Sequence, residues 1–84
     1  MTQERLMLEG RLAERQREAA ELKLKIEAER DQARILLDKY LPVGKVEFAK
    51  GAMLLTDCVR LQRKYLDALE DIETLKLDLG IRDE

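Results

Sequence analysis

Leu41-Pro42-Val43-Gly44 divides the chain almost in half, and the sequence on either side is rich in charged and in regularly spaced apolar residues. Proline cannot donate to a helical hydrogen bond and disfavours helical angles at the residue before it, whereas glycine adopts angles that other residues resist. The stretch therefore predicts a bend between two helices. We expect helix one over about 3–41, the bend at 41–44, helix two over about 45–79 and a short tail at 80–84.

The composition is typical of coiled coils and long helices. Of the 84 residues, 40% are charged, 45% hydrophobic and 4% aromatic, a balance that favours helix over sheet. Disorder is the alternative, but the apolar residues fall at helical spacing and are not diluted by Pro, Ser and Gly. A chain of this length has room for one domain, here residues 1–84, and buries a modest fraction of its surface alone. Help from a partner is therefore expected.

Several residue types used in catalysis are missing, because the sequence has no His, Ser, Asn or Trp. Ser-His-Asp and Cys-His nucleophiles and mixed carboxylate–histidine metal sites are therefore not available. A phosphate-binding loop is not indicated at Gly44-Lys45, since no Gly stands five residues earlier and no Ser or Thr follows. We expect no enzyme activity, no cofactor, no metal site and no small-molecule substrate.

The first residues are charged and lack the apolar core of a secretory signal. No apolar run approaches the roughly 18 residues of a membrane span. We therefore expect a soluble, cytoplasmic protein. Short, charged, helical reading frames of this kind are frequent in bacterial and bacteriophage genomes, which favours such an origin.

Apolar residues in the first half recur with the spacing of a coiled-coil seam. This seam comprises Leu8, Leu12, Ala19, Leu22, Ile26, Ala33, Leu36 and Tyr40. Arg15 and Glu29 interrupt it with charge. A weaker apolar row runs beside it at Leu6, Ala13, Ala20 and Leu24. Thr2 is placed to cap the start of the helix.

The second half has the stronger pattern, with steps of four and three that continue without a break. Its seam comprises Leu54, Cys58, Leu61, Tyr65, Ala68, Ile72, Leu75 and Leu79. Four more apolar residues, Leu55, Val59, Leu66 and Leu69, widen the apolar stripe on one side. A stripe this wide faces more than one neighbour. Gly51 precedes the seam and either lets another backbone approach or kinks the helix.

The ends of helix two carry recognisable signals. Gly44 as N-cap would place Val43 and Phe48 in a hydrophobic staple that sets the entry angle. Gly80 suits the left-handed residue that follows a helix, and Ile81 would fold back on Leu75 or its neighbours.

Charge favours a fold-back. Residues 39–64 carry six basic and two acidic residues, giving +4, and residues 67–84 carry two basic and seven acidic residues, giving −5. In an antiparallel hairpin the acidic end would lie beside the arginines of helix one, Arg5, Arg11, Arg15 and Arg17. The sequence thus predicts an all-α, coiled-coil-like, antiparallel two-helix hairpin.

A single hairpin would leave the flanking apolar residues exposed, and monomers rarely tolerate long apolar patches. Two-fold association into a four-helix bundle would bury them. We expect a homodimer, with another protein as the competing partner. The expected interface residues are Leu22, Ile26, Leu36, Leu55, Val59, Leu61, Tyr65, Leu66, Leu69, Ile72 and Leu75.

Two function classes remain open. The leading interpretation is a structural or regulatory protein-interaction module. The alternative is a small nucleic-acid-associated regulator that binds phosphates through a basic patch near the bend, formed by Lys39, Lys45, Lys50, Arg60, Arg63 and Lys64. Against it stand the overall charge of −2 and the pI near 5.3. Cys58, Tyr40 and Tyr65 are most simply seam residues, with a reactive thiol and interface hot spots as the functional readings.

Overall fold

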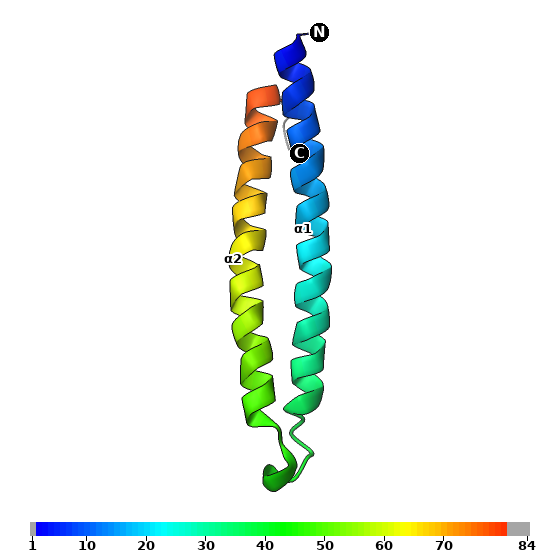
Figure 1. Ribbon diagram of the computed structural model, residues 1–84, viewed down its shortest axis with the longest axis vertical. Coiled ribbons are helices and arrows are strands. Elements are labelled where there is room, and N and C mark those ends of the chain that lie inside the picture. The colour runs from blue at the N-terminus through cyan, green and yellow to red at the C-terminus, as the bar shows by residue number, and fades with distance from the viewer. Residues whose placement is uncertain (1, 81–84) are drawn as a thin grey trace.

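The computed structural model describes residues 2–80, which form two long helices, α1 (Gln3–Leu36) and α2 (Phe48–Leu79), with a short 3₁₀ turn, η1 (Val43–Lys45), between them. The helices run antiparallel and side by side, with the connection at one end (Figure 1). Residues 2–80 contain no strand. The all-helical hairpin is therefore confirmed. The molecule is a thin rod with extents of 63 × 23 × 14 Å.

Two of the helix ends follow local sequence signals. The side-chain oxygen of Thr2 accepts a hydrogen bond from the backbone N–H of Arg5 at 3.2 Å, which makes Thr2 the N-cap of α1. Gly80 ends α2 in the left-handed conformation, with φ of 74°, and its N–H donates to the carbonyl of Leu77 at 3.1 Å. Both signals were predicted. The contact expected of Ile81 lies outside the described residues.

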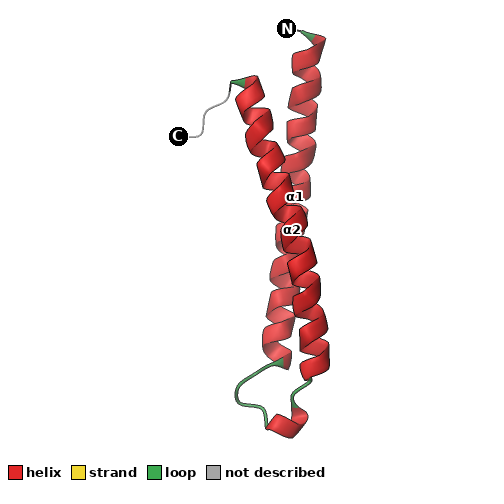
Figure 2. Ribbon diagram, turned by 90° about the vertical axis from the view of Figure 1, so that its left-hand side faces the viewer, coloured by secondary structure: helices red, strands yellow, loops and turns green. Residues whose placement is uncertain are grey.

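The bend is longer than predicted. Helix α1 ends at Leu36 and not near residue 41, and α2 begins at Phe48 and not at residue 45, so the connection is the open loop in Figure 2. Its first turn is held by Asp38, whose Oδ1 accepts from the backbone N–H of Tyr40 at 2.9 Å. Aspartate bonds of this kind compete with helical hydrogen bonds, which explains why α1 stops before Pro42.

The predicted staple is therefore wrong. Glu47, and not Gly44, is the N-cap of α2, and its side chain makes no capping bond. Val43 lies in the 3₁₀ turn and is 81% exposed, while Phe48 is the first helical residue and is 58% exposed. Tyr40 is 83% exposed because the helix that would have carried it into the seam has already ended.

The seam between the helices is thin. Its buried apolar residues are Leu12, Ala19, Ala33, Leu61, Ala68, Ile72, Leu75 and Leu79. Alanine is prominent among them, and none of the large side chains in residues 2–80 is completely buried. Most of these residues form one cluster at the end away from the bend, against which Leu8 and Tyr65 pack.

Gly51 makes room for a side chain and not for a backbone. A Cβ atom at this buried position would lie 2.8 Å from Cδ2 and 2.9 Å from Cγ of Leu37. Leu37 is the residue that follows α1. Helix α2 continues through Gly51 as one element from Phe48 to Leu79, so the glycine allows Leu37 to close the seam at the bend.

Candidate interaction surface

One side of α2 carries an exposed line of apolar residues, which we call the apolar row: Leu55, Val59, Leu66 and Leu69, with Gln62 at its centre. Their exposed fractions are 44% for Leu55, 67% for Val59, 55% for Leu66 and 39% for Leu69. Seven residues make nearly two helical turns, so Leu55, Gln62 and Leu69 align with Lys76.

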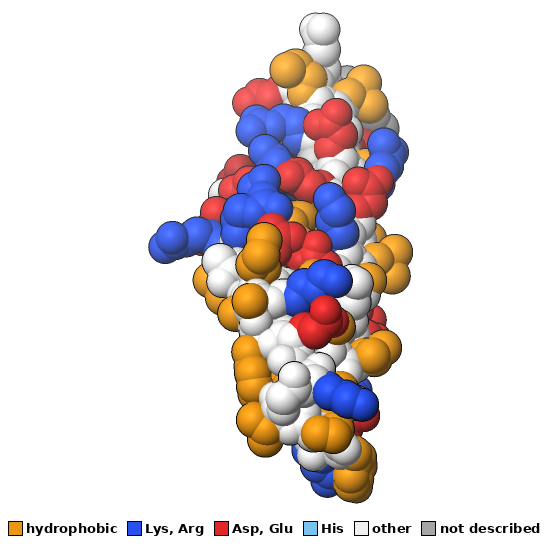
Figure 3. All heavy atoms as spheres, turned by 60° about the horizontal axis from the view of Figure 1, so that its bottom comes forward, with side chains coloured by type: hydrophobic (Ala, Val, Ile, Leu, Met, Phe, Trp, Pro, Cys, Tyr) orange, Lys and Arg blue, Asp and Glu red, His pale blue; other side chains and the backbone are white. Residues whose placement is uncertain are grey.

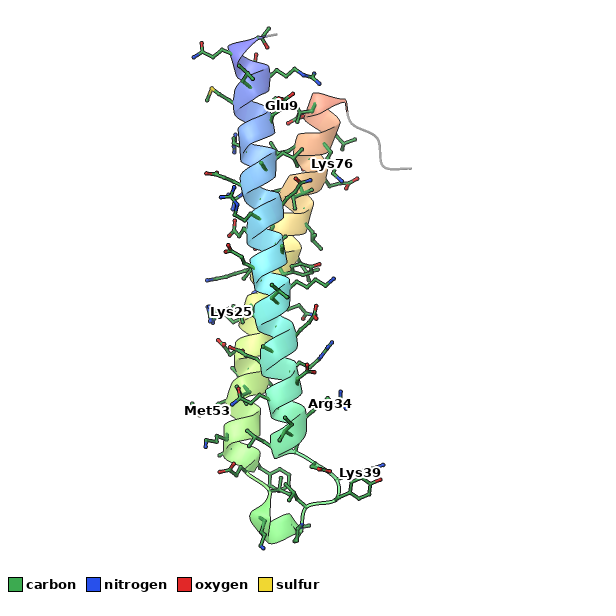
Figure 4. The ribbon with its side chains drawn as sticks, turned by 90° about the vertical axis from the view of Figure 1, so that its right-hand side faces the viewer. Glu9, Lys25, Arg34, Lys39, Met53 and Lys76 are labelled. Atoms are coloured by element: carbon green, nitrogen blue, oxygen red, sulfur yellow. The ribbon has the colours of Figure 1, made fainter. Side chains whose placement is uncertain are left out.

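The labelled side chains of Figure 4 show which side this is. Arg34 and Lys76 lie on one side of the hairpin, and Lys25 and Met53 lie on the other. Because the apolar row aligns with Lys76, it belongs to the side of Arg34. Leu55 and Arg34 also line the same surface depression, which agrees with this placement.

The predicted interface residues divide into two groups. One group belongs to the seam and is buried or half-buried between α1 and α2: Leu22, Ile26, Leu36, Leu61, Tyr65, Ile72 and Leu75. The other group is the apolar row, which remains exposed beside the seam. Helix α1 therefore covers only part of the apolar face of α2.

At the bend end, the apolar row runs into an open depression of about 770 Å³. Leu55 of α2 lines it together with Ile35, Leu37 and Tyr40 from the α1 side. Its charged lining is contributed by Arg30, Asp31, Arg34, Asp38 and Lys39. Figure 3 shows hydrophobic side chains gathered around this end of the molecule, with charged ones denser away from it.

Arg30 and Arg34 were not predicted to lie beside the apolar row, because their place near Leu55 depends on how the two helices pack. Gln62 and Glu73 were missed too. A signal for both was present, since they continue the four-and-three spacing of the apolar row.

The first charged interruption of the seam, Arg15, is paired. Its Nη1 lies 2.6 Å from Oε2 of Glu18 on its own helix, and its Nε lies 3.5 Å from Oδ2 of Asp71 on α2. The hydrogen bond to Glu18, and then its negative charge, raise the pKa of Arg15. The ion pair with Asp71 places Arg15, one of the four arginines predicted there, beside the acidic part of α2.

The second interruption, Glu29, meets another acid. A hydrogen bond to Asp57, then burial and repulsion by the Asp57 charge, raise the pKa of Glu29. Asp57 accepts hydrogen bonds from Arg60 at 2.9 Å from Nε and 2.6 Å from Nη2, and these bonds are the largest cause of its lowered pKa. Ionisation of both carboxyls is therefore unfavourable, and Oε2 of Glu29 is a buried side-chain atom without a hydrogen-bond partner in residues 2–80.

Cys58 lies beside this acidic pair in the seam. Its Sγ is 3.9 Å from the backbone oxygen of Ile26, and the residue is half-buried. Burial first, and then the charges of Glu29 and Asp57, raise the pKa of the thiol. These surroundings disfavour the thiolate and support the structural reading of Cys58 over the reactive one.

The six residues of the predicted basic patch form two separate groups. Lys39 and Lys45 lie in the bend and Lys50 in the first turns of α2. Arg60 lies about 15 Å further along that helix than Lys50, with Arg63 and Lys64 beyond it. Several have local partners. Lys39 Nζ lies 5.0 Å from the centre of the Tyr40 ring, Lys50 Nζ lies 3.8 Å from Glu47 Oε1, and Arg60 bonds to Asp57.

Within residues 2–80, no three His, Cys, Asp or Glu side chains are grouped so as to hold a metal ion. In the same part of the chain, neither helix combines the length and the apolar character needed to cross a bilayer. Comparisons of the chain with models of protein families, with curated proteins and with solved structures find no match.

Proposed function

We propose that this chain is a non-enzymatic oligomerisation and protein-interaction module of the cytoplasm, which acts by packing two hairpins through their apolar rows into a four-helix bundle. The observation that carries this proposal is the exposed apolar row of α2. Its four apolar members lie on one helix, beside a seam that is already occupied. Helix α1 leaves them exposed, so a second molecule packed on this side would bury them.

The surface area supports a second copy. The chain exposes 6988 Å², whereas a compact monomer of 9.8 kDa exposes roughly 5,200 Å². The excess is about 1,800 Å², which is more than the roughly 800 Å² that each partner loses in a standard interface. The radius of gyration of 18.4 Å, against about 12 Å for a compact chain of this length, shows that the excess comes from the rod shape. Lateral pairing of rods removes such an excess.

The thin seam between α1 and α2 also supports packing of a second hairpin. A hairpin whose core consists of one seam of eight buried apolar residues, three of them alanine, gains less from burial than a core with packing on several sides. Adding a second hairpin on the apolar row gives α2 a second packed face. This is the packing by which four-helix bundles enclose a central core.

Sedimentation velocity at micromolar concentration tests the proposal. We expect a mass of twice 9.8 kDa, and we expect Leu66→Asp with Leu69→Asp to reduce it to one chain while circular dichroism retains most of the helical signal. The matched control is Met53→Asp, a change at a 73% exposed residue of the same helix on the opposite side (Figure 4). A wild-type mass of one chain would refute self-association. Equal loss of mass in the control would remove the apolar row as its site.

A further inference from the structure

We propose that the second copy lies antiparallel on the apolar row, with α2 against α2 and the two Gln62 residues near the two-fold axis, so that Glu73 of each copy meets Arg34 of the other. This inference rests on the proposed self-association and specifies its geometry. Apolar contacts alone do not choose between parallel and antiparallel packing, since the apolar row would be covered in both. Charge makes the choice.

The charge of α2 changes sign at its middle. Residues 48–64 contain four basic residues and one acid, which gives +3: Lys50, Arg60, Arg63, Lys64 and Asp57. Residues 65–79 contain one basic residue and five acids, which gives −4: Lys76, Asp67, Glu70, Asp71, Glu73 and Asp78. The helix therefore has a basic half near the bend and an acidic half away from it.

Helix α1 does not neutralise this asymmetry. Residues 3–22, which lie beside the acidic half, contain four arginines and five glutamates and so carry −1; residues 23–36 contain four basic residues and three acids and so carry +1. The arginines expected to offset the acidic end are partly used on their own helix, as Arg5 pairs with Glu9 at 3.3 Å and Arg15 with Glu18. Together, residues 23–36 and 48–64 carry +4 in the half of the hairpin beside the bend, and residues 3–22 and 65–79 carry −5 in the other half.

An antiparallel neighbour matches these ends and a parallel neighbour opposes them. In the antiparallel arrangement, the basic half of each α2 lies along the acidic half of the other. In the parallel arrangement, like charges face each other along the whole helix, and juxtaposed like charges suppress association.

The apolar row also has the symmetry that an antiparallel pair needs. Leu55 and Leu69 each lie seven residues from Gln62, and Val59 and Leu66 lie three and four residues from it. Reversal about Gln62 therefore places Leu55 beside Leu69 and Val59 beside Leu66 of the second copy. A polar residue in an otherwise apolar helical interface penalises shifted registers, in which it would face leucine.

The same reversal fixes the place of Glu73. It stands four residues beyond Leu69 in the apolar row, so it comes to the level of Gly51 and Ala52 of the second copy, about one turn from Leu55. There, Leu55 borders the depression lined by Arg30 and Arg34. A carboxylate from the second copy thus reaches two guanidinium groups on the rim of an apolar contact, where charge-assisted bonds are favourable.

Within one hairpin, Arg34 and Glu73 cannot meet. Gly51 lies against Leu37 at the bend end, and Glu73 is 22 residues further along α2, or about 33 Å. In a parallel dimer, they would be separated by the same length. Contact between these two residues is therefore specific to the antiparallel dimer.

Charge exchange between two variants tests the proposal. Arg34→Glu or Glu73→Arg alone places like charges at both contacts, and we expect each to weaken self-association at least about tenfold in sedimentation equilibrium. An equimolar mixture of the two restores association, because opposite charges then meet at both contacts. Met53→Glu, at a 73% exposed residue on the opposite side of the hairpin (Figure 4), is the matched control and leaves association unchanged. Circular dichroism verifies that each variant is helical.

A distance measurement gives a second readout. A nitroxide at Thr74→Cys in a Cys58→Ala background lies 12 residues from Gln62, so two labels in the antiparallel dimer are about 36 Å apart along the axes. Parallel helices would hold them within roughly 20 Å. A wild-type dimer without rescue in the mixture, or with the short distance, overturns the antiparallel arrangement and leaves the proposed function standing. A monomeric wild type overturns the proposed function itself.

Discussion

The two ends of the hairpin are packed differently. Away from the bend, six buried residues form one continuous cluster: Leu12, Ala19, Ala68, Ile72, Leu75 and Leu79. Toward the bend, the seam has the buried residues Ala33, Gly51 and Leu61, and the Glu29–Asp57 pair breaks its apolar character. The exposed apolar row has two members on each side of the helix centre, and the most exposed of them, Val59 at 67%, lies on the bend side. The far end therefore contributes more buried apolar surface to the hairpin than the bend half does.

The largest effect is expected from the far cluster. Leu75→Ala removes a side chain that is 7% exposed, and we expect a loss of about 2–3 kcal/mol in the free energy of unfolding. Leu54→Ala, in the half-buried seam near the bend, should cost less than half as much. Urea denaturation of both variants at one protein concentration measures the difference.

Leu77→Ala is the matched control, because Leu77 is 71% exposed on the same helix as Leu75 and its loss should change stability by less than about 0.5 kcal/mol. Equal losses for Leu75→Ala and Leu54→Ala would show that the two ends contribute equally.

Substitution of the two helical glycines by alanine should change stability by a smaller amount, and in different ways at the two positions. A Cβ at Gly10 would meet no atom within 4 Å, so Gly10→Ala should stabilise the protein by about 1 kcal/mol through helix propensity. At Gly51 the same change places Cβ 2.8 Å from a Leu37 methyl carbon, and displacement of that side chain should cancel the gain. Thermal unfolding of both variants tests this, and the double variant Gly51→Ala with Leu37→Ala should recover part of the propensity gain. An equal rise in Tm for the two single variants would contradict the role assigned to Leu37.

The acidic pair predicts a pH dependence in the bend half. Because the pKa of Glu29 is raised on folding, protonated Glu29 stabilises the fold below its ordinary pKa of about 4.3, and this contribution is lost as pH rises through the folded value. The pKa of Asp57 is lowered, so its contribution is present above its ordinary value and is lost as pH falls. Glu29→Gln keeps a donor for Asp57 without the charge. It should therefore be more stable than the wild type at neutral pH.

The measurement is urea denaturation near pH 4 and near pH 7, since the advantage of Glu29→Gln should shrink where Glu29 is already protonated. Lys25 and Arg60 also act on this site and lower the pKa of Glu29. A variant less stable than the wild type at neutral pH would mean that attraction to these cations outweighs repulsion by Asp57.

The smallest effect is expected for nucleic acid. The six basic residues considered for phosphate binding lie in two groups, and three of them have local partners. We therefore expect no shift of DNA or RNA in a gel assay at low salt. A shift that disappears at higher salt, and that Lys39→Glu with Lys45→Glu abolishes, would instead establish the regulator alternative.

The sequence alone determined the features that depend on neighbours along the chain. Helical periodicity predicted α1 and α2 and their seam, the Thr2 cap needed one side-chain oxygen, and Gly80 ends α2 because glycine tolerates a positive φ. The signal that was overlooked was also local, since the Asp38 turn ends α1 before Pro42. The predicted staple fails at the other end of the bend, where α2 begins at Phe48 with Glu47 as its N-cap.

Only the tertiary structure decided which apolar residues α1 covers and which it leaves exposed on α2. Periodicity marked both rows as apolar, but a helix buries only the side that faces its neighbour, so the exposed row depends on how α1 is placed. The packing of α1 on α2 also brings Glu29 near Asp57, and it brings Arg34 and Leu55 to one depression. These residues are 28 and 21 positions apart in the sequence, and nothing local to either member encodes the distance between them.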